Sequence, residues 1–149
     1  MRQTLSRIML ALLLTANVSL AKANTVEGQA QLRSLTSLFM EKTSAGDIAA
    51  AYRSLRPYLG VEAAPYDRSA ADAADYFARV TEKAGQPVGR SHVRTETIGS
   101  DFTREIWLQK FEAAAIVWRF TFYQPTGDGW KLVGVSYSTD MEPLYQPLQ

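Results

Sequence analysis

The chain has 149 residues, with 16 Lys and Arg, 15 Asp and Glu, one His and no Cys. The absence of Cys excludes disulfides, thiol nucleophiles and Cys-ligated metals, so an apolar core must hold a domain of this size together. The near balance of charge lacks the strongly basic surface that phosphate contacts need, and we therefore expect no nucleic-acid partner.

Residues 1–23 are predicted to be a signal peptide. Arg2 and Arg7 precede the apolar run 8–16, and Ala21-Lys22-Ala23 fits a small-x-small cleavage site. The run is about half of the roughly 20 residues that a membrane span needs, which favours export and cleavage near Ala23 over a retained anchor. We expect a periplasmic or secreted domain, 24–149, with no membrane span after cleavage. It would carry 13 basic residues against 15 acidic ones, because Arg2, Arg7 and Lys22 are lost.

Two antiparallel helices are predicted next. The first has an apolar stripe made of Leu32, Leu35, Leu38 and Phe39. Gly46 suits the left-handed C-cap of this helix, and Asp47 suits the N-cap of the second. The second stripe is formed by Ile48, Ala51, Tyr52 and Leu55. Pro57 is expected to end this helix, since the residue before a proline disfavours helical geometry.

Residues 57–68 are predicted to be a loop, the place to expect the rim of a site. A third helix is predicted from Ser69, with Asp72 three positions on in the manner of a capping box. Its alanine-rich stripe comprises Ala70, Ala73, Ala74, Phe77 and Val80. Such small residues allow close approach to a sheet, and Gly85 and Pro87 end the helix.

After this helix the apolar period changes to two, which predicts four strands over 88–98, 103–111, 114–124 and 130–139. Short turns join them, so we expect an antiparallel meander. Helices first and strands after indicate an α+β domain with about three helices on a four-stranded sheet.

Alternation in the last two strands separates two faces. The row predicted to be buried comprises Ile116, Trp118, Phe120 and Phe122, joined by Trp130 and Leu132. The opposite face is predicted to hold Val117, Arg119, Thr121, Val133, Val135 and Tyr137. This second face is half apolar, which suits contact with a partner. The alternative is that the C-terminal segment 141–145 shields it.

The late strands carry Phe111-Glu112, Trp118-x-Phe120-x-Phe122-Tyr123-x-Pro125 and Asp128-Gly129-Trp130-x-Leu132. With the preceding helices, this pattern resembles the nuclear-transport-factor-2-like (cystatin-like) superfamily from about Leu32 to Leu144, and small exported bacterial members in particular. The resemblance implies a cone-like curved sheet wrapped on long helices, a cavity open at one end and a homodimer through the outer sheet face. The short strand usual between the second and third helices has only 58–61 as a counterpart.

His92 is the only histidine, and alternation places it with Arg90, Arg94 and Glu96. These residues could line a site in which His92 is the acid/base and the arginines grip an anion. The alternative is a solvent-facing strand surface, with ion pairs to Arg104 or Lys110. Tyr52, Tyr58, Tyr66 and Trp107, with Tyr123, could line an apolar pocket at the mouth of the cone.

We expect no cofactor and no metal, because one His and scattered carboxylates do not make a ligand set. Glu105 and Glu112 form no catalytic pair at their spacing. The function expected is therefore a non-catalytic exported domain that binds an unidentified small molecule or envelope protein. The alternative is a small isomerase or dehydratase that uses His92 in the cone cavity.

Overall fold

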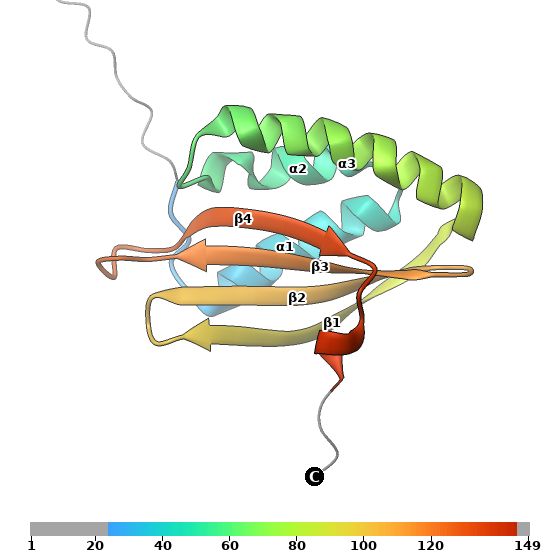
Figure 1. Ribbon diagram of the computed structural model, residues 1–149. Helices are drawn as coiled ribbons and strands as arrows, with labels where there is room; N and C mark the ends of the chain where they lie inside the picture. The colour runs from blue at the N-terminus through green and yellow to red at the C-terminus, as the bar shows by residue number, and fades with distance from the viewer. Residues whose placement is uncertain (1–23, 146–149) are drawn as a thin grey trace, which may run out of the picture.

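The computed structural model describes residues 24–145, in which three helices precede a four-stranded sheet (Figure 1). The helices are α1 (Gln29–Ser44), α2 (Ile48–Leu55) and α3 (Ala63–Ala84), and the short 3-10 turns are η1 (Arg56–Tyr58) and η2 (Glu142–Leu144). The strands are β1 (Pro87–Ile98), β2 (Phe102–Phe111), β3 (Ala115–Tyr123) and β4 (Lys131–Ser138). They pair antiparallel in the order β1-β2-β3-β4, which confirms the α+β class and the meander. The predicted signal peptide lies outside the described residues.

The predicted junction between α1 and α2 is confirmed. Gly46 adopts a φ of 82°, and the amide of Ala50 donates to Asp47 Oδ1 at 2.8 Å. The buried row of α1 differs from the predicted stripe at Leu38, which is 42% exposed. Leu32 and Phe39 are buried as predicted and Leu35 packs against the core, while Thr36, Met40 and Thr43 complete the row. Two threonines belong to this row, so a pattern of apolar side chains alone does not show it in full.

The predicted start of α3 at Ser69 is wrong, because the helix begins at Ala63. Pro65 is its third residue, and a proline is tolerated there since the first amides of a helix have no partner within it. The predicted loop 57–68 is therefore mostly helical. Tyr66 belongs to α3 rather than to a flexible rim.

A short connection between η1 and α3 supplies one extra bridge to the sheet. Leu59 pairs parallel with Leu132 of β4, and the amide of Gly60 donates to the Leu132 carbonyl oxygen at 2.8 Å. Near the start of the described residues, Val26 forms an antiparallel bridge with Trp130. Both bridges lie at the start of β4 and tie the helical half to that strand.

Aromatic rings fill the space between the helices and the sheet. Trp118, Phe120 and Phe122 are all 0% exposed, which confirms the predicted inward row. The Phe39 ring of α1 lies 5.1 Å from that of Trp118, and the Phe77 ring of α3 stacks on Trp118 at 5.0 Å. The interior of the cone is therefore a packed core.

A bulge between β3 and β4 places two side chains on the helix side of the sheet. The register shifts at Thr121 and Phe122, so Leu132 lies opposite Phe122 while Val135 lies opposite Phe120. Simple alternation predicted Val135 and Tyr137 on the outer face, and this is wrong. The ring of Tyr137 lies 5.1 Å from that of Trp118 in the core.

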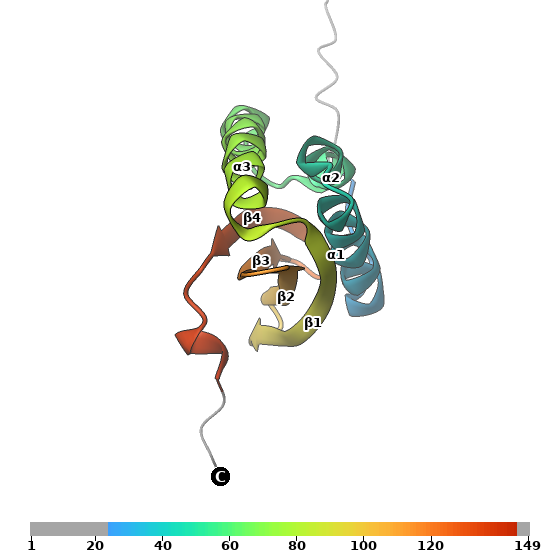
Figure 2. The ribbon, with the colours of Figure 1, turned by 90° about the vertical axis from the view of Figure 1, so that its right-hand side faces the viewer.

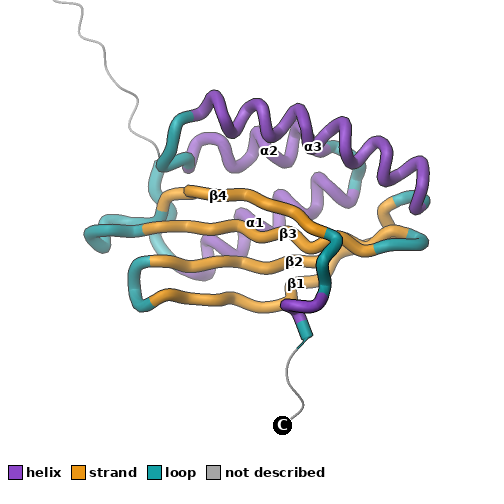
Figure 3. Tube along the Cα trace, viewed as in Figure 1, coloured by secondary structure: helices purple, strands orange, loops and turns teal. Residues whose placement is uncertain are grey.

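The sheet is curved and twisted, and its outer face carries no α-helix (Figure 2). Turns and loops gather at the two ends of the strands (Figure 3). The C-terminal segment crosses one end of the outer face (Figure 1), where Arg94 donates to the carbonyl oxygens of Pro143 at 2.9 Å and Leu144 at 3.2 Å. Val117 lies on this face by register and is nevertheless buried. Within 24–145, no helix combines the length and hydrophobicity needed to cross a membrane.

Candidate functional site

A row of polar side chains on β2 faces the helices. Thr103, Glu105, Trp107 and Gln109 alternate along the strand, and all four are buried. Trp107 Nε1 donates to Thr36 Oγ1 at 3.0 Å, and Gln109 Nε2 donates to the Thr43 carbonyl oxygen at 3.1 Å. Buried polar groups need such partners, and both bonds reach α1. The row therefore fixes α1 to the sheet.

Glu105 is the centre of an ionic cluster formed by Arg33, His92, Thr95 and Glu105, here called the Glu105 cluster. Its side chain is 1% exposed, and Oε2 lies 2.6 Å from His92 Nε2 and 3.0 Å from Arg33 Nε. Thr95 Oγ1 donates to Oε1 at 2.9 Å and accepts from Arg33 Nη2 at 2.9 Å. A carboxylate without such donors would be costly to bury.

The Glu105 cluster can hold an imidazole in one orientation. The carboxylate fixes His92 Nε2, and the edge of the His92 ring packs against Trp107 with centroids 4.9 Å apart. The His92 side chain is 20% exposed and that of Arg33 is 48% exposed, so water reaches one side of the cluster. Orientation by a carboxylate is how an acid/base histidine is positioned. The same contacts also tie α1, β1 and β2 together.

A second bulge, in β1, separates the residues predicted to share a lining with His92. The register shifts between His92 and Arg94, so Arg90 and His92 face the helices while Arg94 and Glu96 face outward. The predicted common face is therefore wrong. Arg90 Nη2 lies 3.8 Å from an oxygen of Glu41, whereas Arg94 Nε donates to Glu96 Oε1 at 2.9 Å on the other side.

The predicted tyrosines form a separate group. Tyr52 and Tyr66 are buried with ring centroids 5.2 Å apart, and the Tyr66 hydroxyl donates to the Tyr52 carbonyl oxygen at 2.8 Å. Burial raises the pKa of both phenols above the usual value, with a smaller contribution from the neighbouring charges. The two rings border an apolar cleft of about 340 Å³ between α3 and β4, which also includes Val61 and Val133. Tyr58 packs against the core instead.

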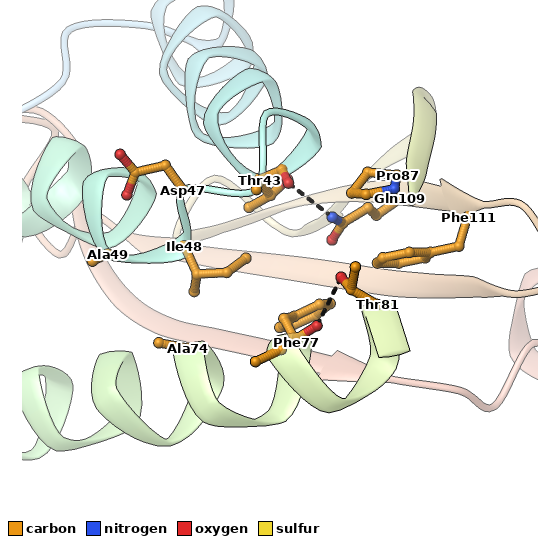
Figure 4. Close-up of a pocket in the computed structure, with 12 residues that line it drawn as sticks. Thr43, Asp47, Ile48, Ala49, Ala74, Phe77, Thr81, Pro87, Gln109 and Phe111 are labelled. Carbon is orange, nitrogen blue, oxygen red and sulfur yellow. Dashed lines mark hydrogen bonds between the residues drawn. The ribbon is translucent and has the colours of Figure 1, made fainter. Parts of the chain in front are cut away.

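A smaller cleft of about 220 Å³ opens at the end of the cone, between α1, α2, α3 and β2 (Figure 4). The rings of Phe77 and Phe111 and the side chain of Gln109 line it. Its polar groups already have partners: Gln109 bonds to Thr43, and Thr81 Oγ1 donates to the Phe77 carbonyl oxygen at 3.0 Å (Figure 4). The cleft therefore offers a ligand mainly apolar contact. None of the predicted ligand residues lines it.

A larger cleft of about 500 Å³ lies on the outer face of the sheet, at the end away from the C-terminal segment. It is lined by Glu96, Thr97, Ile98, Phe102, Arg104 and Thr121. Phe102 stacks on Tyr123 beside it, with centroids 4.6 Å apart. The sequence did not single out this cleft, because it arises where three strands meet.

Residues 24–145 bring together no group of three His, Cys, Asp or Glu side chains able to hold a metal ion. Searches against protein families, curated proteins and solved structures find no match to this chain.

Sequence reasoning missed Arg33, Thr95 and Glu105 as partners of His92. Alternation from Thr103 to Phe111 would have placed Glu105 on the same inward face as Trp107. Arg33 is on a different helix, 72 positions away from Glu105, so no local pattern joins the two. The alternative of a strand surface with an ion pair to Arg104 holds for Glu96, whose Oε2 lies 3.6 Å from Arg104 Nη1, whereas His92 faces the helices and contacts Glu105.

Proposed function

We propose that this chain is an exported, non-catalytic binding domain of the nuclear-transport-factor-2-like kind, which engages a partner with the outer face of its sheet. The observation that carries the proposal is the filled interior, where Trp118, Phe120 and Phe122 have no exposed surface. An isomerase or dehydratase of this shape would need room for its substrate between the sheet and the helices. Here aromatic side chains fill most of that space, and the polar groups of the cleft of about 220 Å³ at its end already have partners.

The relation to the superfamily is supported by the order of elements and by the bridge between Leu59 and Leu132, which stands where the short extra strand is expected. The outer sheet face is the surface through which such proteins are expected to associate. The residues of that face differ from the predicted set, because Val135 and Tyr137 belong to the core and the C-terminal segment binds Arg94 at one end. The open part surrounds Ile98, Phe102 and Arg104.

A second candidate is an enzyme with His92 as its acid/base, favoured by the 2.6 Å contact between His92 Nε2 and Glu105 Oε2. Arg33 and Thr95 also bind this carboxylate, so the same residues have a structural role, because they join α1 and β1 to β2.

Native mass spectrometry of the protein purified from the cell envelope tests the two candidates. For a binding domain we expect the polypeptide alone or in complex with another polypeptide. A co-purified small molecule that is converted by the protein, and not by its His92→Gln variant, would establish the enzyme instead. An Arg68→Gln variant, altered on the exposed surface of α3, is the matched control.

A further inference from the structure

The helix-free face of the sheet is organised in rungs that run across all four strands. One rung comprises Arg94, Ile106, Arg119 and Ser136, and the next comprises Glu96, Arg104, Thr121 and Gly134. The last comprises Ile98, Phe102, Tyr123 and Lys131. Strand order therefore sets an apolar rung beside two rungs that carry guanidinium groups.

Charge is distributed unevenly between this face and the rest of the domain. By register, the face holds five basic residues, Arg94, Arg104, Lys110, Arg119 and Lys131, against one acidic residue, Glu96. Of the other acidic residues after β1 begins, Glu105 lies on the helix side, Asp101, Glu112 and Asp128 lie in turns, and Asp140 and Glu142 belong to the C-terminal segment at the far end of the face. The face is thus basic, although the domain 24–149 has more acidic than basic residues. Such a surface attracts an anionic partner.

Glu96, the single acidic residue on the strands of this face, positions two arginines, Arg94 and Arg104. Glu96 Oε1 accepts from Arg94 Nε at 2.9 Å, and Glu96 Oε2 lies 3.6 Å from Arg104 Nη1. Arg104 Nε also donates to Thr121 Oγ1 at 3.3 Å. None of the salt bridges within 24–145 involves Lys110, Arg119 or Lys131. The face therefore combines cationic side chains outside these salt bridges with the guanidinium groups of Arg94 and Arg104, which hydrogen bonds hold in place.

The rung that contains Ile98 and Phe102 borders a cleft on this basic face. The cleft has a volume of about 500 Å³, and Ile98 on its border is 70% exposed. An exposed aliphatic side chain beside a stacked aromatic pair suits the anchor residue of a partner. The C-terminal segment occupies the other end of the face through its bonds to Arg94, which leaves this end open.

We propose that this cleft and its arginines bind an acidic segment of another protein, with one aliphatic or aromatic side chain seated between Ile98 and Phe102. This inference rests on the proposed binding function and specifies its partner. A second copy of the chain fits less well, because pairing two such faces would set basic residues against basic residues. Nucleic acid fits less well too, since Phe102 and Tyr123 already stack on each other.

Fluorescence anisotropy with a labelled peptide of alternating Glu and Phe tests the proposal, using the protein as purified from the envelope. We expect saturable binding that weakens about tenfold in Arg104→Glu and severalfold in Ile98→Ser. Arg68→Glu makes the same charge change on the exposed surface of α3 and should leave the affinity within about twofold. A peptide with Lys in place of Glu should not bind.

Several results would overturn the proposal. Absence of saturable binding by the acidic peptide would do so, as would equal weakening by Arg104→Glu and Arg68→Glu. Binding of phosphatidylglycerol vesicles or single-stranded DNA without the peptide would assign the face to a membrane or to nucleic acid. A dimer in analytical ultracentrifugation that Arg104→Glu dissociates would assign it to a second copy. Turnover that depends on His92 would instead contradict the proposed function, so the two failures are distinct.

Discussion

At the scale of single residues, Glu105 contributes most to the ties between the layers. One buried carboxylate accepts from side chains of α1 and β1, and its neighbours Trp107 and Gln109 bond to the same helix. Each bond is modest alone, since a protein hydrogen bond replaces one to water. Leaving a buried partner without its donor is what costs free energy.

Arg33→Met should lower the free energy of unfolding by about 1–3 kcal/mol, because the buried Glu105 carboxylate loses the Arg33 guanidinium, one of its three hydrogen-bond partners, while the apolar stem is kept. We expect a value in the lower half of this range, since the Arg33 side chain is half exposed. Urea unfolding followed by tryptophan fluorescence measures it. Arg68→Met is the control, and equal stability of the two variants would show that the Glu105 cluster adds nothing.

Tyr66→Phe removes the bond from the Tyr66 hydroxyl to the Tyr52 carbonyl oxygen and should cost about 1 kcal/mol at neutral pH. Burial raises the pKa of Tyr66 in the folded state above its value in the unfolded chain. Stability from this group is therefore complete below the unfolded pKa, about 10, and is lost as pH rises above it. The free energy of unfolding, measured between neutral and strongly alkaline pH, should therefore fall less steeply with pH in Tyr66→Phe than in the unchanged protein. The exposed Tyr145→Phe should not alter the slope.

At the scale of elements, two bulges decide which chemistry each face presents. The shift in β1 divides Arg90 and His92 from Arg94 and Glu96, and the shift between β3 and β4 turns Val135 toward the core. One extra residue in a strand reverses the facing of every side chain after it. The functional surface is thus a product of strand register.

Val135→Lys tests this register. We expect it to destabilise the domain by about 2–3 kcal/mol, because Val135 packs against the core and a lysine there would have to move its charge outward. Ser136→Lys, one residue on and exposed on the outer face, should change stability by less than about 0.5 kcal/mol. Thermal or urea unfolding distinguishes the pair. The reverse order would mean that uninterrupted alternation describes β4 correctly.

At the scale of the whole molecule, the two faces of the sheet have different roles. The helix side is closed by aromatic packing, and the outer side is partly closed by the chain's own C-terminal segment. Two residues of the outer face, Ile106 and Val117, are buried as well. Within residues 24–145, the end near Ile98 is open to a partner.

Arg94→Ala should loosen the C-terminal segment from the sheet. Its guanidinium bonds two carbonyl oxygens there, so we expect the amides of Leu144 and Tyr145 to exchange with deuterium several times faster. Hydrogen exchange followed by mass spectrometry measures this. Arg104→Ala is the control, because Arg104 bonds to Thr121 and Glu96 instead. Unchanged exchange in Arg94→Ala would mean that other contacts hold the segment.

The sequence by itself determined the α+β class, the Asp47 cap, the four strands to within about a residue and the inward row from Trp118 to Phe122. Each of these depends on local propensity or on a short apolar period, which neighbouring residues record. The tertiary structure alone decided the Glu105 cluster, the early start of α3 and the facing of Arg94 and Val135. Arg33 contacts Glu105 only after the helix and the sheet pack together, and a bulge depends on pairing with the partner strand. The spacing of neighbouring residues in the sequence therefore indicates neither.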